Sequence, residues 1–414
     1  MLNKSFVVLF LKLLAAACSF ALNIVLVRKL GSEESGIFFF YQTQILFFSV
    51  LATLGLQNLI IRESALITGG NSNLYSMLKG LPLVAIIIST ITALAIGIYN
   101  NLVDLNQFSV SQFFQLGLGI FFLAINVILC SVNQGEARFY SSVIFQTLFF
   151  NLFLLISLLF SPVDMSANSL INIYLLSLLF AVIIQFRRIF SGDIRYKDIV
   201  SSTVDYRFIF ISCLPFIIMM ASERAVVLVI QYFLGKELGS EAISYFTVIV
   251  RVVAVPVLIL SAVNVILSRR ISISYQSRDI DSLNSMAKKT SRIIIPVSMI
   301  FFLVFTFFSK EILSIFGEEF IVLQMPLVIA SLGQCINLAT GTVSMFLLMT
   351  GNEKKLRNSL VISVLCSVSY IVFFAGDFSI FDAVIAFSIY QVVSNLLSWF
   401  FVKKELGINT VQVF

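Results

Sequence analysis

Apolar stretches about as long as a transmembrane helix recur from one end of this chain to the other. A bilayer core needs roughly 20 consecutive apolar residues per helix. Within the stretches, polar and apolar residues do not alternate as they do in the strands of a membrane β-barrel. The pattern predicts an all-α integral membrane protein with about twelve spanning helices, at residues 5–27, 37–61, 81–99, 112–132, 142–160, 169–186, 208–231, 243–267, 290–308, 321–349, 358–375 and 383–402.

Composition supports a bilayer as the main solvent and leaves no room for a soluble domain. The 414 residues are 59% hydrophobic and 12% charged, whereas a soluble domain usually carries about 25% charged residues. Lys4 and Lys12 precede an apolar run, as in a secretory signal peptide, but no cleavage site followed by a polar mature domain appears. The first stretch is therefore predicted to be a retained helix.

The positions of Lys and Arg predict the orientation. With the N-terminus in the cytoplasm, 20 of the 27 Lys and Arg fall on the cytoplasmic side, where membrane proteins carry their excess of positive charge. The exceptions are Arg28, Lys29, Lys236 and Lys310 outside, and Lys12, Arg224 and Arg251 within spans. Both termini are thus predicted to be cytoplasmic. The net charge of +6 is a topology signal and does not suggest a nucleic-acid partner.

No cofactor, metal or enzymatic site is expected. The five cysteines stand alone in apolar stretches, and the chain contains no His, which excludes a histidine metal site. Gly235 and Lys236 lack the remainder of a Walker A motif, so ATP is not bound by that motif. A membrane glycan polymerase would need clustered catalytic carboxylates or a long outer loop, and the sequence shows neither.

A short repeat divides the chain into halves. Leu-Gly-Ser-Glu occurs at residues 30–33, between the first two stretches, and again at 238–241, between the seventh and eighth. The offset of 238 − 30 = 208 is close to half of 414. We expect two six-helix lobes, residues 1–190 and 207–414, joined by a cytoplasmic linker at 191–206. An even number of spans per half makes the repeat parallel, with a pseudo-twofold axis along the membrane normal.

Ionisable and polar residues within the spans are the candidate site, because a charge at bilayer depth needs a cavity or a partner. Each also has a structural interpretation. Lys12 could snorkel to the interface, and Arg28 and Arg62 could set topology from span ends. Glu223 could pair with Arg251 or Lys12 in a structural bridge. The polar stripes that include Gln57, Asn126 and Gln334 could serve only as interhelical hydrogen bonds.

Four segments carry a resemblance to a known family. They are Arg28–Gly31, Leu54–Glu63, Tyr232–Gly235 leading to Tyr245 and Arg251, and Ile315–Phe320. In order and spacing they resemble the Wzx-type O-antigen and polysaccharide flippases of the multidrug, oligosaccharidyl-lipid and polysaccharide exporter superfamily. The resemblance covers nearly the whole chain.

The resemblance implies a flippase of lipopolysaccharide or capsule biosynthesis in a bacterial inner membrane. It would move an undecaprenyl-diphosphate-linked oligosaccharide to the outer leaflet by alternating access, with the polysaccharide polymerase and chain-length machinery as further partners. Arginine and lysine favour phosphate, and amides suit sugars. The predicted substrate contacts are therefore Arg251, Arg28, Arg62, Lys12 and Arg224 for the diphosphate and Gln57, Asn126 and Gln334 for the glycan.

Glu223 is the candidate for proton or sodium coupling, since family members often carry an Asp in the seventh helix. Two alternatives stay open. An ion-coupled multidrug exporter of the same superfamily would move cationic or amphipathic compounds; a cationic lumen disfavours it, although one Glu could be enough. A membrane glycan polymerase is the less favoured alternative.

Overall fold

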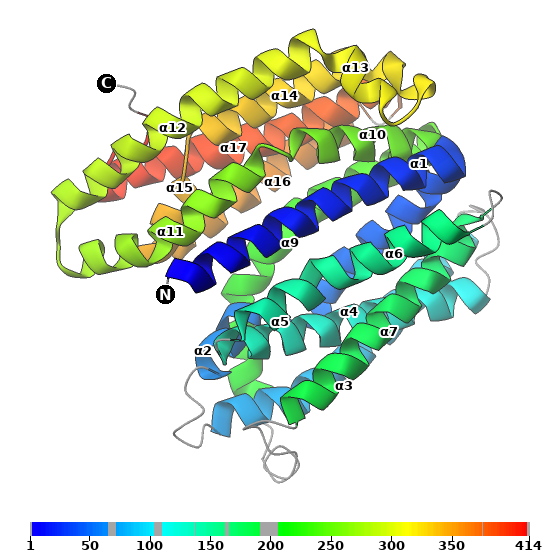
Figure 1. Cartoon of the computed structure of the whole chain (residues 1–414), viewed down its shortest axis with the longest axis horizontal. Coiled ribbons are helices and arrows are strands. Elements are labelled where there is room, and N and C mark those ends of the chain that lie inside the picture. Colours follow the sequence, from blue (N-terminus) through cyan, green and yellow to red (C-terminus); the bar gives the residue numbers. More distant parts are fainter. Residues whose placement is uncertain are drawn as a thin grey trace. The chain divides into compact units, whose positions relative to one another are not determined.

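The computed structural model describes residues 2–64, 72–102, 110–136, 138–161, 165–190, 206–374 and 376–411. All regular elements in these ranges are helices, as Figure 1 shows, so the predicted all-α class is confirmed. By length and composition, ten helices of the described chain are long and apolar enough to cross a membrane.

Ten such helices replace the predicted twelve for two local reasons. Helix α1 (Leu2–Ala52) runs through the first two predicted spans and is interrupted at Gly31, where φ is 77° and ψ is 173°. The predicted eighth span is broken into α10 (Ser240–Val253) and α11 (Val257–Gln276) on either side of Pro256. Because proline has no N–H to donate within a helix, the predicted span does not continue as one helix through residues 254–256.

The chain forms two compact units. The first comprises Met1–Leu30 and Ile37–Arg224, and the second comprises Gly31–Gly36 and Ala225–Phe414. Helix α9 (Tyr206–Glu237) thus passes from the first unit to the second. The expected linker at 191–206 lies almost wholly outside the described residues.

In the first unit, helix α4 is the central packing element and contacts α2, α3 and α7. The helices after α1 are α2 (Gln57–Ser64), α3 (Ser72–Leu102), α4 (Val110–Gly135), α5 (Phe139–Val143), a π-helical turn (Ile144–Leu148), α6 (Phe149–Phe160) and α7 (Ala167–Phe190). The chain turns sharply between α1 and α2 because Leu54 and Gly55 adopt φ of 52° and 64°.

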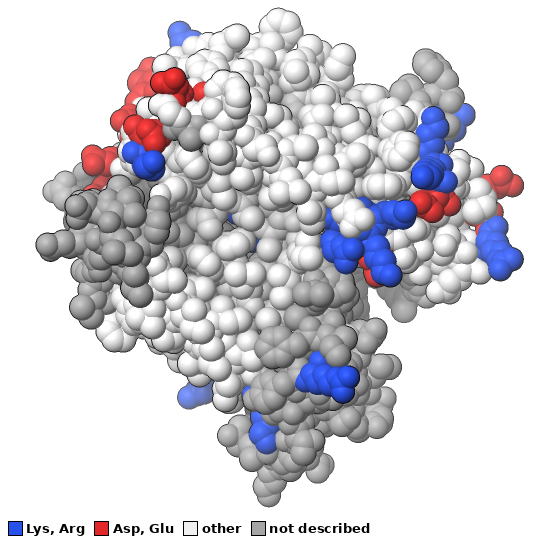
Figure 2. Space-filling model, turned by 180° about the vertical axis from the view of Figure 1, so that it is seen from behind, with Lys and Arg blue, Asp and Glu red and all other residues white. Residues whose placement is uncertain are grey.

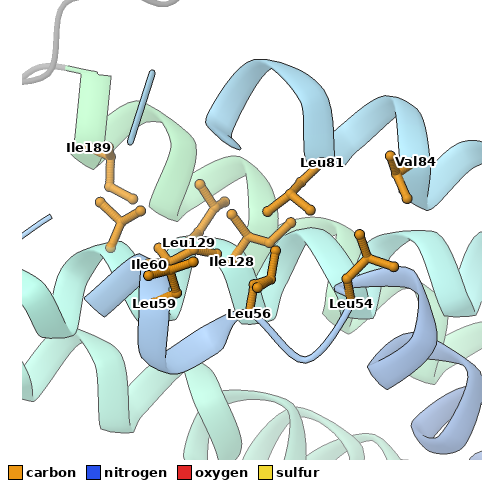
Figure 3. Packing of buried hydrophobic residues seen from close by; sticks show 10 residues of the cluster. Leu54, Leu56, Leu59, Ile60, Leu81, Val84, Ile128, Leu129 and Ile189 are labelled. Atoms are coloured by element: carbon orange, nitrogen blue, oxygen red, sulfur yellow. The ribbon is translucent and has the colours of Figure 1, made fainter. Parts of the chain in front are cut away.

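A buried apolar cluster fixes this turn (Figure 3). It gathers side chains from the turn itself and from α2, α3, α4 and α7: Leu54, Leu56, Leu59, Ile60, Leu81, Val84, Ile128, Leu129, Val132 and Ile189. Leu54 is not glycine, so its left-handed backbone costs energy. Burial of Leu54 to 5% exposure compensates for that cost.

An amide network ties α4 to α7. Gln185 Nε2 donates to Asn126 Oδ1 at 2.7 Å, and Gln185 Oε1 accepts from Asn133 Nδ2 at 3.2 Å and from Cys130 Sγ at 3.3 Å. Asn126 Nδ2 continues to the carbonyl oxygen of Phe145 in the π-helical turn, at 3.1 Å. All four side chains of the network are buried. A polar group without a partner is costly there, so the network selects one register of α4 against α7.

In the second unit, helix α14 packs against α10, α12 and α17. The elements after α11 are α12 (Ile280–Phe307), α13 (Ser309–Ser314), a 3₁₀ helix (Glu318–Leu323), α14 (Gln324–Ala339), α15 (Val343–Met349), α16 (Glu353–Phe373) and α17 (Ile380–Leu406). Helices α14 and α17 approach closely at Gly333, where an added Cβ would lie 2.8 Å from the Ser388 Cβ.

The helices present large apolar side chains outward, as a bilayer requires. Phe160 and Phe373, for example, are 87% and 82% exposed. On the face seen in Figure 2, most visible described atoms belong to uncharged residues, and Lys, Arg, Asp and Glu gather in a few groups. The structure is that of a multi-pass membrane protein.

We expect Gln185→Leu to lower the free energy of unfolding by about 1–2 kcal/mol, because it removes the hydrogen bonds of Gln185 to Asn126 Oδ1, Asn133 Nδ2 and Cys130 Sγ. Thermal unfolding in detergent measures the change. Gln134→Leu, at an exposed position of α4, is the matched control and should leave the melting temperature unchanged. An unchanged melting temperature in Gln185→Leu would show that the network does not stabilise the unit.

Candidate transport site

Three predicted spans are interrupted in the structure. The second breaks between Ala52 and Gln57, the eighth between Val253 and Val257, and the tenth between Ala339 and Val343. Interrupted helices free backbone N–H and C=O groups, and in transporters such breaks are found beside substrate and ion sites. The breaks therefore mark the regions in which a site is to be sought.

Arg251 lies on α10, less than one turn before that helix ends at Val253. It is partly exposed and continues a polar face that runs through Ser244 and Thr247 at helical spacing. Thr247 Oγ1 accepts a hydrogen bond from Gln231 Nε2 of α9 at 2.9 Å. Ser244 and Thr247 thus make protein contacts, and Arg251, at the end of the same face, is partly exposed.

Gln334 is held by a second glutamine. Its Oε1 accepts from Gln391 Nε2 at 2.7 Å, between α14 and α17. Gln334 is only 2% exposed, and its Nε2 has no hydrogen-bond partner among the described residues. It therefore retains one donor in a buried polar spot of the second unit.

Asn126 is 1% exposed, and both ends of its amide are used, one by Gln185 and one by the Phe145 carbonyl. In this structure its amide links helices and is buried. Asn126 thus makes interhelical hydrogen bonds in this structure, which is the structural interpretation of the polar stripes. Gln57, at the start of α2, is partly exposed.

The remaining predicted site residues are exposed or lie outside the described side chains. Lys12, Arg28, Glu223 and Arg224 are exposed, and Arg62 lies on α2 with its side chain outside the described part. Lys12 and Arg28 are 16 residues apart on the unbroken first part of α1, about 24 Å at 1.5 Å per residue. One diphosphate can therefore contact these two residues only in succession.

The sequence interpretation missed the partners of the buried amides. Gln185 and Gln391 each complete a pair across two helices, and Gln115 Nε2 of α4 donates to both Asn168 and Asn172 of α7, at 2.7 and 2.9 Å. The glutamines and asparagines within the apolar stretches of the sequence could have indicated these positions. The sequence alone does not show which of them hydrogen-bond to each other.

Comparisons with known proteins give a fold. No protein-family model and no curated protein matches the sequence. Among solved structures, the inward-facing conformation of a multidrug resistance MATE family transporter of the MOP superfamily matches with a TM-score of 0.74 and 14% identity, over 96% of this chain and 94% of that one. MATE multidrug transporter DinF-BH, in complex with rhodamine 6G, matches with a TM-score of 0.72 and 12% identity, over 99% and 96%.

A MOP superfamily transporter from Pyrococcus furiosus, described as having a binding pocket of reverse polarity, matches with a TM-score of 0.66 and 14% identity, over 98% of this chain and 96% of that one. At such identities a likeness shows the fold and does not single out the Wzx-type flippases. The chain has the two-lobe fold of the MATE transporters of the MOP superfamily.

Proposed function

We propose that this protein is a membrane exporter of amphipathic organic compounds that works by alternating access, with multidrug export as the first candidate function. The observation that carries the proposal is the match, over nearly the whole length of both chains, to MATE multidrug transporters, one of them in complex with rhodamine 6G. The chemistry of the described spans agrees with transport, because the buried polar contacts cited above are made by amides and hydroxyls.

Glu223 gives such an exporter its coupling group. It is an exposed carboxylate on α9, at a depth where an ionisable residue is expected to serve an ion or substrate path. A cationic cargo and a proton or sodium ion would compete for this carboxylate. Binding of the ion would then release the cargo, as differential affinity for two states requires.

The second candidate function is the flipping of a lipid-diphosphate-linked glycan toward the outer leaflet. A specific observation favours it: three basic residues, Lys12, Arg224 and Arg251, lie within predicted spans, compared with one acidic residue, Glu223. All four are at least partly exposed. Arginine and lysine bind phosphate. Outward movement of negative charge would run with an inside-negative potential, worth about 2.3 kcal/mol per charge per 100 mV.

Depletion of the protein in its own host decides between the two candidates. Multidrug export predicts new sensitivity to cationic amphipathic compounds and retention of rhodamine 6G, with lipid-linked glycans unchanged. Flipping predicts that complete repeat units accumulate on the cytoplasmic leaflet and that surface polysaccharide is lost. A depleted strain with neither change would contradict transport of both kinds of cargo.

Arg251→Glu tests the sign of the charge beside the α10–α11 break. If the cargo is an anionic diphosphate, export should fall at least tenfold while the amount of protein in the membrane stays normal, because a carboxylate repels phosphate. If the cargo is a cation, efflux should be kept or should rise. Lys289→Glu makes the same charge change at an exposed position on α12 and should alter neither.

A further inference from the structure

The two copies of the Leu-Gly-Ser-Glu repeat share a backbone geometry. Gly31 has φ 77° and ψ 173°, and Gly239 has φ 86° and ψ −178°. This combination of angles is accessible essentially to glycine alone. In both copies the glycine directly precedes a helical segment that starts with serine, so the repeat in the sequence is also a repeat in structure.

The two helix starts that follow these glycines pack against each other. Each has small residues four positions apart, Ser32 and Gly36 in one and Ser240 and Ser244 in the other, and such spacing lets helix backbones approach closely. A Cβ added at Gly36 would overlap the carbonyl oxygen of Ser240 and would lie 3.3 Å from the Ser244 nitrogen. Only glycine fits at position 36 in this arrangement.

Hydrogen bonds complete the contact. The hydroxyl oxygens of Ser35 and Ser244 are 2.7 Å apart, and both side chains are fully buried. Ser32 Oγ also donates to Glu319 Oε2 at 3.2 Å. The contact therefore depends on hydroxyls and close backbone packing.

The place of this contact in the chain suggests a switch. Residues Gly31–Gly36 belong to the second unit, whereas α1 on either side, up to Leu30 and from Ile37, belongs to the first. A rearrangement of one unit against the other must therefore bend the chain at the ends of this segment or release it from α10. Gly31 stands at one of these ends, where a glycine can absorb a large change of φ and ψ.

We propose that Gly31–Gly36 and the first turns of α10 form a latch on the extracytoplasmic side, which is closed in this structure and separates each time the transporter opens outward. The inference rests on the proposed alternating-access function. It goes beyond that function in assigning closure to the two copies of the repeat, with the Ser35–Ser244 pair as the point of contact.

A reversible cross-link tests the latch. In a chain whose five native cysteines are replaced by serine, Ser35→Cys and Ser244→Cys would place two thiols where hydroxyl oxygens now lie 2.7 Å apart. Oxidation should lower transport at least tenfold, and a reductant should restore it. The matched control is Ser274→Cys with Ser282→Cys, whose hydroxyls are 3.2 Å apart between α11 and α12. Oxidation of this second pair should leave transport unchanged.

Transport is measured in two assays, glycan export and rhodamine 6G efflux, so that the cargo and the latch are tested separately. If the cysteine-free chain moves neither cargo, the proposed function fails, and the latch is then judged by labelling alone. For this, Ser244→Cys is exposed to a membrane-impermeant maleimide from outside. The buried thiol should be unreactive in resting membranes and should react when the membrane is energised. Unchanged transport through the oxidised latch pair, or no gain in labelling, would overturn the latch.

Discussion

Internal hydrogen bonding of the backbone N–H and C=O groups is the constraint on which this structure depends. A bilayer core offers no water to a free N–H or C=O, so the described regular elements are all helical, and each helix break needs a local remedy. At the break between α14 and α15, the Thr410 hydroxyl donates to the Thr340 carbonyl at 2.9 Å, and Ser291 donates to the Thr410 carbonyl in turn. At the α1–α2 turn, Gly55 N–H donates back to the Val50 carbonyl at 3.1 Å.

The same constraint separates two kinds of polar residue. Neutral amides and hydroxyls act inside the spans, where Gln185 links to Asn126 and Gln391 to Gln334. The ion pairs seen among described residues lie at helix ends, as in Lys355–Glu405 at 3.2 Å. Stability inside the bilayer therefore comes from uncharged hydrogen bonds and packing. The charged residues within the predicted spans, Lys12, Glu223, Arg224 and Arg251, are at least partly exposed.

Duplication links the fold to its proposed motion. Two copies of one short motif supply two glycines with the same backbone angles, and these start two helical segments that meet through small residues. A contact of this kind is specific, because a single Cβ at Gly36 would disrupt it. It is also slight enough to open and close, which is what a transporter with two alternating states requires of its contacts.

The sequence by itself determined the helical class, the approximate spans, the orientation expected from its basic loops and the position of the repeat. These properties follow from local features: the length of apolar runs, the alternation of charged loops and a four-residue identity.

Only the tertiary structure decided which polar residues pair with one another. Asn126 was predicted to face a sugar, yet its partner Gln185 is 59 residues away in the chain and holds its amide in a helix contact. Ser35 and Ser244 are separated by 209 residues and meet through one hydroxyl pair. No local pattern encodes such pairings, because they depend on the rotation and approach of whole helices that the packing of the rest of the unit sets.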